Sequence, residues 1–119
     1  EAGLKKAIGE VQRLRGEYWQ DVVVPGEKNN LNPNLERASR VADFIEMGEL
    51  IARDALHRSE SCGGHFREEY QTAEGEAKRN DAEFSYAAAW EWTGDGKEQA
   101  LHKEPLVFEN VHIAERSYK

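Results

Sequence analysis

The sequence predicts an α+β fold that is mainly α: two long antiparallel helices, an irregular loop and a β-hairpin. Three patterns support this. Apolar residues recur at three- and four-residue steps over residues 1–59, no period survives over residues 60–83, and an alternation of period two begins at Phe84. We therefore expect a helical bundle segment over 1–59, a loop over 60–83, and a hairpin with a C-terminal tail over 84–119.

The first helix is predicted over residues 1–21. Its apolar residues share one face of a helix: Leu4, Ile8, Val11, Leu14 and Tyr18. Gly9 and Gly16 each weaken a helix by up to about 1 kcal/mol relative to alanine, so packing against a partner must hold it. The turn dipeptide Pro25-Gly26 ends the helical pattern.

The second helix is predicted over residues 33–59. Asn32 is a capping residue type, and Pro33 at the first helical position costs no hydrogen bond. One apolar stripe comprises Leu35, Ala38, Val41, Ala42, Ile45, Leu50, Ala52 and Leu56. A second face carries Phe44, Met47, Gly48 and Ile51. A helix with two such faces packs against two partners, so we expect an incomplete three-helix bundle whose third helix is missing.

The hairpin is predicted from alternating side chains. Phe84, Tyr86, Ala88, Trp90 and Trp92 point one way and their neighbours the other. Gly94-Asp95-Gly96 is a turn, and Gln99 to Lys103 is the return strand, which ends at Pro105. A weaker extended tail runs on to Lys119.

Composition excludes several classes of function. Acidic residues outnumber basic ones, 23 to 16, which gives a formal net charge of −7. Such a field repels phosphate backbones, so nucleic acid is not an expected partner. No apolar run approaches the roughly 20 residues that span a bilayer. One cysteine excludes an internal disulfide framework.

The densest group of reactive side chains lies in the loop. His57, Cys62 and His65 suggest a metal site, and hence a metal-dependent hydrolase, but the paired ligand spacing of zinc sites is missing. Cys62 with His65 as base would be a nucleophile, although known pairs are not sequence neighbours. Gly63-Gly64 lacks the flanking pattern of a phosphate-binding loop.

Two further interpretations of the loop stay open. In the first, Gly63 or Gly64 supplies a left-handed turn at the helix exit, and the charged residues are solvated or pair locally. In the second, the loop is a docking segment, in which Arg58 and Arg67 present rigid donor pairs to carboxylates and His65 bonds a neighbouring domain.

This loop resembles a family signature. It reads Arg58-x-Glu60-Ser61-x-Gly63-Gly64-His65-Phe66-Arg67-Glu68-Glu69-Tyr70. The signature Arg-x-Glu-Ser-Arg-Gly-x-His-x-Arg-x-Asp-Tyr lies in the C-terminal domain of flavoprotein subunits of succinate dehydrogenase and fumarate reductase. Further similar segments are residues 3–8, 31–36, 42–56, 84–92, 102–106 and 116–119. One departure is Cys62, where the family commonly has arginine, so no role of that arginine is carried over.

The resemblance implies a fold and an activity. The fold is a spectrin-repeat-like three-helix bundle without its first helix, followed by the hairpin. The parent protein interconverts succinate and fumarate through FAD, in respiratory electron transfer and the tricarboxylic acid cycle. The FAD-binding domain lies upstream and is absent here, so we expect this fragment to bind no FAD or metal, to hold no catalytic residue, and to be inactive by itself.

The resemblance also implies partners. We expect six residues to face the flavin domain: Arg58, Glu60, Ser61, His65, Arg67 and Tyr70. Beyond that upstream domain, the parent complex contains an iron–sulfur subunit and a membrane anchor, which place it at the cytoplasmic face of the inner membrane as a peripheral subunit. The alternative is a free-standing helical module whose exposed apolar face binds another protein's helix.

Overall fold

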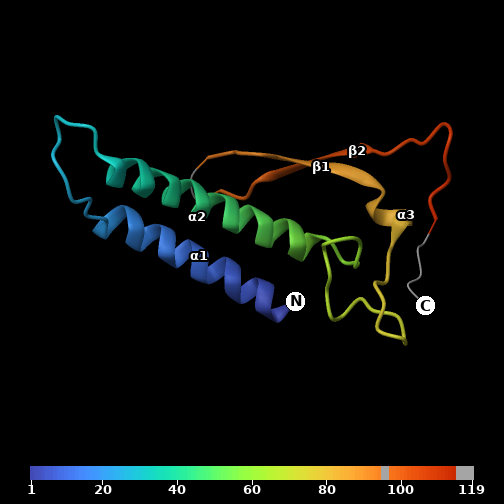
Figure 1. Cartoon of the computed structure of the whole chain (residues 1–119). Coiled ribbons are helices and arrows are strands. Elements are labelled where there is room, and N and C mark those ends of the chain that lie inside the picture. The colour runs from blue at the N-terminus through green and yellow to red at the C-terminus, as the bar shows by residue number, and fades with distance from the viewer. Residues whose placement is uncertain (95–96, 115–119) are drawn as a thin grey trace. The chain divides into compact units, whose positions relative to one another are not determined.

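The computed structural model describes residues 1–94 and 97–114. The elements follow in the order α1 (Ala2–Asp21), α2 (Pro33–His57), α3 (Asp81–Phe84), β1 (Tyr86–Glu91) and β2 (Ala100–Pro105) (Figure 1). The predicted α+β class, mainly helical with a terminal hairpin, is confirmed. The chain divides into two compact units, Glu1–Ser59 and Glu60–Lys119, and each is described by itself.

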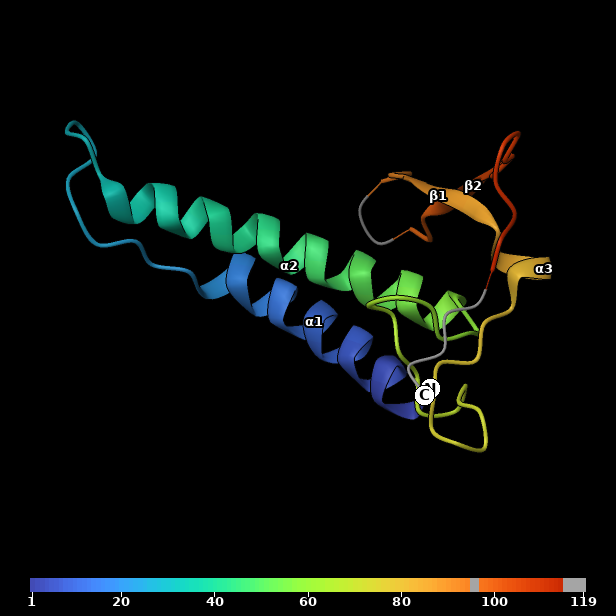
Figure 2. The same ribbon diagram turned by 45° about the vertical axis from the view of Figure 1, so that its right-hand side comes forward.

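In the first unit, α1 and α2 pack side by side and antiparallel (Figures 1 and 2). The predicted cap is present: Asn34 N donates to Asn32 Oδ1 at 3.0 Å, and Pro33 opens α2. The helix ends at His57, where residues 33–59 were expected. Arg58 N still donates to Asp54 O at 3.0 Å, but Arg58 itself is extended, and the chain leaves the helix there.

The contact between the helices is narrow and only partly apolar. Ile45 and Ala52 of α2 are buried against half-buried residues of α1. Those α1 residues are Leu4, Ala7, Ile8, Val11, Arg15 and Tyr18. Tyr18 Oη donates to Ala38 O at 2.5 Å, which joins the two helices near the loop between them.

Leu14 does not lie in this contact, contrary to the sequence prediction. Its side chain is 47% exposed, and Arg15 takes the inward position instead. The contact positions follow the 3.6-residue period through Val11, Arg15 and Tyr18, which leaves Leu14 at the flank. Arg15 can be half-buried because its guanidinium meets two carboxylates of α2, Glu46 and Glu49.

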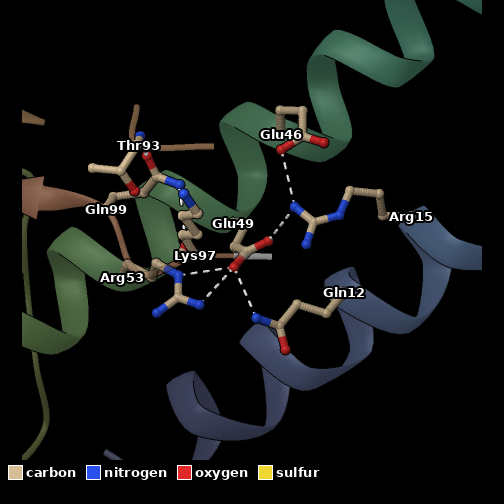
Figure 3. Close-up of polar contacts among 8 residues, drawn as sticks. All are labelled: Gln12, Arg15, Glu46, Glu49, Arg53, Thr93, Lys97 and Gln99. Carbon is tan, nitrogen blue, oxygen red and sulfur yellow. Dashed lines mark hydrogen bonds and ion pairs between the residues drawn. The ribbon is translucent and has the colours of Figure 1, made fainter. Parts of the chain in front are cut away.

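In the second unit, β1 and β2 form an antiparallel pair, with Tyr86 opposite Pro105 and Glu91 opposite Ala100. Within the connection, Thr93 N donates to Gln99 Oε1 at 3.1 Å (Figure 3). Of the predicted turn, Gly94 has a positive φ of 122°, whereas residues 95 and 96 lie outside the described residues.

The predicted strand was too long at both ends. Phe84 belongs to α3, a short helical turn, because Glu83 N and Phe84 N both donate to Asn80 O. That turn buries the Phe84 ring. Trp92 lies beyond the end of β1 and is exposed. The return strand begins at Ala100, one residue later than predicted, and ends at Pro105 as expected.

The tail after β2 forms no further strand within the described residues 106–114. Leu106 N donates to Ser85 O at 3.0 Å, which extends the ladder by one bond. Arg79 Nη1 donates to Ala114 O at 3.1 Å and ties the tail to the segment before α3. Residues 116–119, which the resemblance included, lie outside the described residues.

Candidate functional site

Ser61 is the centre of the loop after α2. Its side chain is fully buried, and its Oγ accepts from Arg67 N at 2.8 Å and donates to Arg67 O at 3.1 Å. Its backbone N donates to Lys78 O at 2.9 Å. One residue therefore joins three stretches of the loop, and a buried polar group of this kind is costly to leave without partners.

Glu60 closes the base of the same loop. Only 2% of its surface is exposed, and its Oε2 accepts from Asn80 N at 2.7 Å. A charged acceptor strengthens a hydrogen bond, which helps to offset the cost of burying the carboxylate. The bond joins residues 20 apart in sequence and brings the two ends of the loop together.

The Gly63-Gly64 pair makes a tight turn. Cys62 N donates to His65 O at 2.8 Å, and His65 N donates to Cys62 O at 3.1 Å. Gly63 has φ +58°, the left-handed region that glycine tolerates best. The expected left-handed glycine is therefore present, but it turns a miniature hairpin and does not end α2, which stops at His57.

Arg67 is buried in this loop, with 5% of its surface exposed. Its guanidinium lies 4.9 Å from the centre of the Tyr70 ring, and its Nε lies 3.5 Å from Glu69 Oε2. Tyr70 N also donates to Arg67 O at 2.9 Å. Of the two outcomes expected for charged loop residues, solvation or local pairing, Arg67 and Glu60 show the second, because both side chains are buried and contact other loop residues.

A second turn stabilises the far side of the loop. Lys78 N donates to Tyr70 O at 3.2 Å, and Thr72 N donates to Glu76 O at 2.9 Å. The Thr72 hydroxyl accepts from the backbone of Glu74 and of Glu76, at 3.3 and 3.2 Å. The loop is thus closed by its own hydrogen bonds, although it contains almost no regular secondary structure.

The six residues expected to face the flavin domain fall into two groups. Glu60, Ser61 and Arg67 are buried. Arg58, His65 and Tyr70 are partly accessible. Beside His65, the Phe66 ring is 51% exposed. The framework role of the buried group was not foreseen, because it depends on contacts and not on residue type.

The loop does not fit a flavin or a metal. A dinucleotide loop lies between a strand and a helix and offers backbone N–H groups to a pyrophosphate. Here the N–H groups of Cys62 and His65 are already bonded across the turn. Among the described residues, no three His, Cys, Asp or Glu side chains gather in a way that could hold a metal ion.

The second face of α2 is exposed in this chain. Phe44 is 68% and Ile51 62% exposed, and Met47 and Val41 are also exposed. Val41 and Leu35 belong to the first predicted apolar stripe of this helix, but both are exposed. Exposed large apolar side chains in one line on a helix mark a surface for another element.

Leu14 of α1 lies on the same side of the helix pair as this face. Successive residues turn by about 100°, so Phe44 lies roughly 140° around α2 from Glu49. Glu49 contacts Gln12, and Leu14 lies roughly 160° around α1 from Gln12. The helix pair therefore has a polar side, where Gln12 meets Glu49, and an apolar side opposite to it. We call the second the apolar side: Leu14, Val41, Phe44, Met47 and Ile51.

Glu49 is a buried charged residue between the two helices that sequence analysis did not single out. It is 7% exposed and accepts hydrogen bonds from Gln12 and Arg53 (Figure 3). Its spacing from Ile45 and Ala52, four and three residues, was the available signal. Burial raises the pKa of Glu49, but those hydrogen bonds and the charges of Arg15 and Arg53 outweigh it, and the pKa is lowered overall.

Comparison with known proteins gives one match. A family model described as "Fumarate reductase flavoprotein C-term" matches residues 1–118. Searches of curated proteins and of solved structures found no match. Within the described residues, no helix has the length and apolar character needed to cross a membrane. Because the family model covers nearly the whole sequence, the chain belongs to the family of C-terminal domains of succinate dehydrogenase and fumarate reductase flavoproteins.

Proposed function

We propose that this chain is a docking domain of a flavoprotein that interconverts succinate and fumarate, and that residues 60–80 bear on the flavin-carrying part of that protein. One observation supports this above all. Glu60, Ser61 and Arg67 are buried: Glu60 accepts from Asn80 N, Ser61 accepts from Arg67 N, and the Arg67 guanidinium lies over the Tyr70 ring. The loop thereby becomes a firm support that presents His65 and Phe66 at its turn.

In this proposal the redox chemistry belongs to the upstream part of the parent protein. FAD supplies the hydride acceptor, and such a cofactor must be held against the substrate. The loop over residues 60–80, as described, does not fit a flavin, and in this proposal the chain contributes position and not chemistry. The parent passes electrons to an iron–sulfur subunit and a membrane anchor, and it lies as a peripheral subunit on the cytoplasmic face of the inner membrane.

The apolar side of the helix pair receives a third helix of the parent protein. Phe44 and Ile51 are seven residues apart, so they lie on one line of α2, and Leu14 borders that line from α1. An amphipathic helix laid along them completes a three-helix bundle. Burying a fully exposed side chain of the size of Phe44 is worth about 1.5–3 kcal/mol.

The division of labour is tested with the isolated chain. Purified protein is mixed with FAD and succinate, and the flavin absorbance is followed without oxygen. We expect no bleaching beyond a buffer control. Bleaching above that control would contradict the proposal that the acceptor site lies elsewhere.

The docking role is tested by reconstitution. The upstream part of the parent protein, expressed without this domain, is mixed with this chain, and binding and succinate oxidation by a dye are measured. We expect binding to the wild type and its loss in Phe66→Asp, because a charge at the turn would be buried in the contact. Ala82→Asp adds the same charge at an exposed position outside residues 60–80 and is the control.

A second candidate is a free-standing module that binds a helix of another protein. The exposure of Phe44 and Ile51 supports it as well. The same experiment separates the two. A free-standing module would not bind the upstream part of the parent protein, whereas a docking domain binds it. The coding sequence upstream also decides, because a glycine-rich dinucleotide fingerprint in the same reading frame belongs only to the first candidate.

A further inference from the structure

Glu49 joins α1 and α2 through both of its carboxylate oxygens. Oε1 accepts from Gln12 Nε2 at 2.9 Å and from Arg53 Nε at 2.8 Å. Oε2 accepts from Arg15 Nη1 at 2.8 Å. Gln12 and Arg15 belong to α1 and Arg53 to α2, so the carboxylate lies between the two helices (Figure 3).

The charges around Glu49 within the helix pair are balanced. Arg15 comes from α1, and Arg53 and Glu46 come from α2. Arg15 Nη1 also donates to Glu46 Oε2 at 3.0 Å. The side chains of Arg15 and Arg53 are each 27% exposed, whereas that of Glu46 is 52% exposed. Of these four side chains that of Glu49, at 9%, has the least access to water.

The apolar contacts between the helices do not by themselves choose one alignment. α2 presents small residues to α1, including Ala38, Ala42 and Ala52. Leu4, Ile8 and Val11 of α1 are similar in size and repeat at helical spacing. A slide by one turn, about 5.4 Å, replaces one such contact by another at little cost.

The polar contacts between the helices do favour one alignment. The same slide separates Gln12 and Arg15 from Glu49, because each bond spans less than 3 Å. Glu49 would then keep a donor from its own helix, Arg53, and lose both donors of α1. A buried charge that loses its partners is strongly destabilising, and single buried polar residues are known to fix helix register.

We propose that Glu49 is the positioning residue that fixes the register of α1 on α2. The register in turn sets where Leu14 stands beside Phe44 on the apolar side. This inference does not depend on the proposed function, since it concerns only the helix pair.

The test uses the full chain and a marker of register. Tyr18 Oη lies 2.5 Å from Ala38 O, so we expect a nuclear Overhauser effect between the ring of Tyr18 and the methyl of Ala38 in the native register. Glu49→Leu replaces the carboxylate by an apolar side chain of similar size. Such a replacement of a buried ion pair by an apolar group is often tolerated. Glu46→Gln removes the neighbouring, exposed carboxylate and is the matched control.

We expect Glu49→Leu to keep its helical circular dichroism, while the Tyr18–Ala38 effect is lost or divided among several sets of peaks. Glu46→Gln keeps one set and the full effect. Arg15→Met removes one of the two hydrogen bonds from α1 to Glu49 and leaves Glu49 itself in place. We expect it to weaken or divide the Tyr18–Ala38 effect as Glu49→Leu does. It therefore tests the proposal if Glu49→Leu does not fold. One set of peaks with an undiminished Tyr18–Ala38 effect in the folded variants would overturn the proposal.

Discussion

The hydroxyl of Ser61 holds both backbone polar groups of Arg67, accepting from its N at 2.8 Å and donating to its O at 3.1 Å. These two bonds join residues that are six positions apart and close the chain around the Gly63 turn. Because Ser61 is fully buried, water does not compete for them. The direction in which the turn presents His65 and Phe66 therefore depends on one side chain.

Replacing Ser61 by alanine should destabilise the second unit. The backbone groups of Arg67 lose a buried partner, which costs about 1–3 kcal/mol. Urea unfolding, followed through the amide peaks of residues 60–80, measures the free energy of unfolding. Ser39→Ala is the control, since the Ser39 hydroxyl is exposed and donates only to Leu35 O of its own helix. An equal effect of the two substitutions would contradict the role of Ser61.

The two neighbouring glycines should differ in their response to alanine. Gly63→Ala places a side chain at φ +58° and should cost about 1 kcal/mol, although a Cβ there meets nothing within 4 Å. Gly63→Asn should recover part of the loss, because asparagine tolerates this region. Gly64, whose φ is not in the left-handed region, should accept alanine without loss. Thermal unfolding of the three variants checks the order.

Acid should weaken the helix pair through Glu49. The pKa of Glu49 is lower in the folded chain than in the unfolded one. Its contribution to stability is therefore complete above the unfolded value, about 4.3, and is lost as the pH falls through the lower folded value. Urea unfolding of the wild type and Glu49→Gln should differ at pH 7, and the difference should shrink as the pH falls below about 4.3. A difference that stays constant from pH 7 to pH 3 would refute this.

A charge on the apolar side should be harmless in the isolated chain and harmful in the parent protein. Phe44→Asp alters an exposed side chain, so the isolated chain should change by less than about 0.5 kcal/mol. Under a third helix the same carboxylate would be buried, at a cost of at least about 2 kcal/mol. Thermal unfolding of both forms measures this, with Ser39→Asp on the opposite side of α2 as control. Equal behaviour of the two forms would exclude a covering helix.

The sequence predicted the helices well, because their signals are local. Asn32 and Pro33 mark the start of α2, and the 3.6-residue period marks both helices. It misplaced Leu14 because the period alone does not tell a contact position from its flank. Which of two adjacent residues turns inward depends on the partner, and Glu46 and Glu49 of α2 draw Arg15 inward.

The interior of the loop was beyond sequence analysis. Ser61 meets Arg67 and Glu60 meets Asn80, pairs that are 6 and 20 residues apart and follow no period. Sequence analysis left open whether the charged loop residues are solvated or pair locally, because residue type alone does not tell which charged side chains are buried. Phe84 was assigned to the strand because its alternation with Tyr86 fits a period of two. In the structure Phe84 N donates to Asn80 O, and the residue belongs to a helical turn.

Hydrogen exchange in the intact flavoprotein tests the docking claim most directly. Amide exchange over residues 60–80 is compared between this chain alone and the same segment in the whole protein. We predict slower exchange at Gly64 and Phe66 in the whole protein, because the turn is covered there, while Cys62 and His65, already bonded to each other, change less. Equal exchange at Gly64 and Phe66 in the two forms would contradict it.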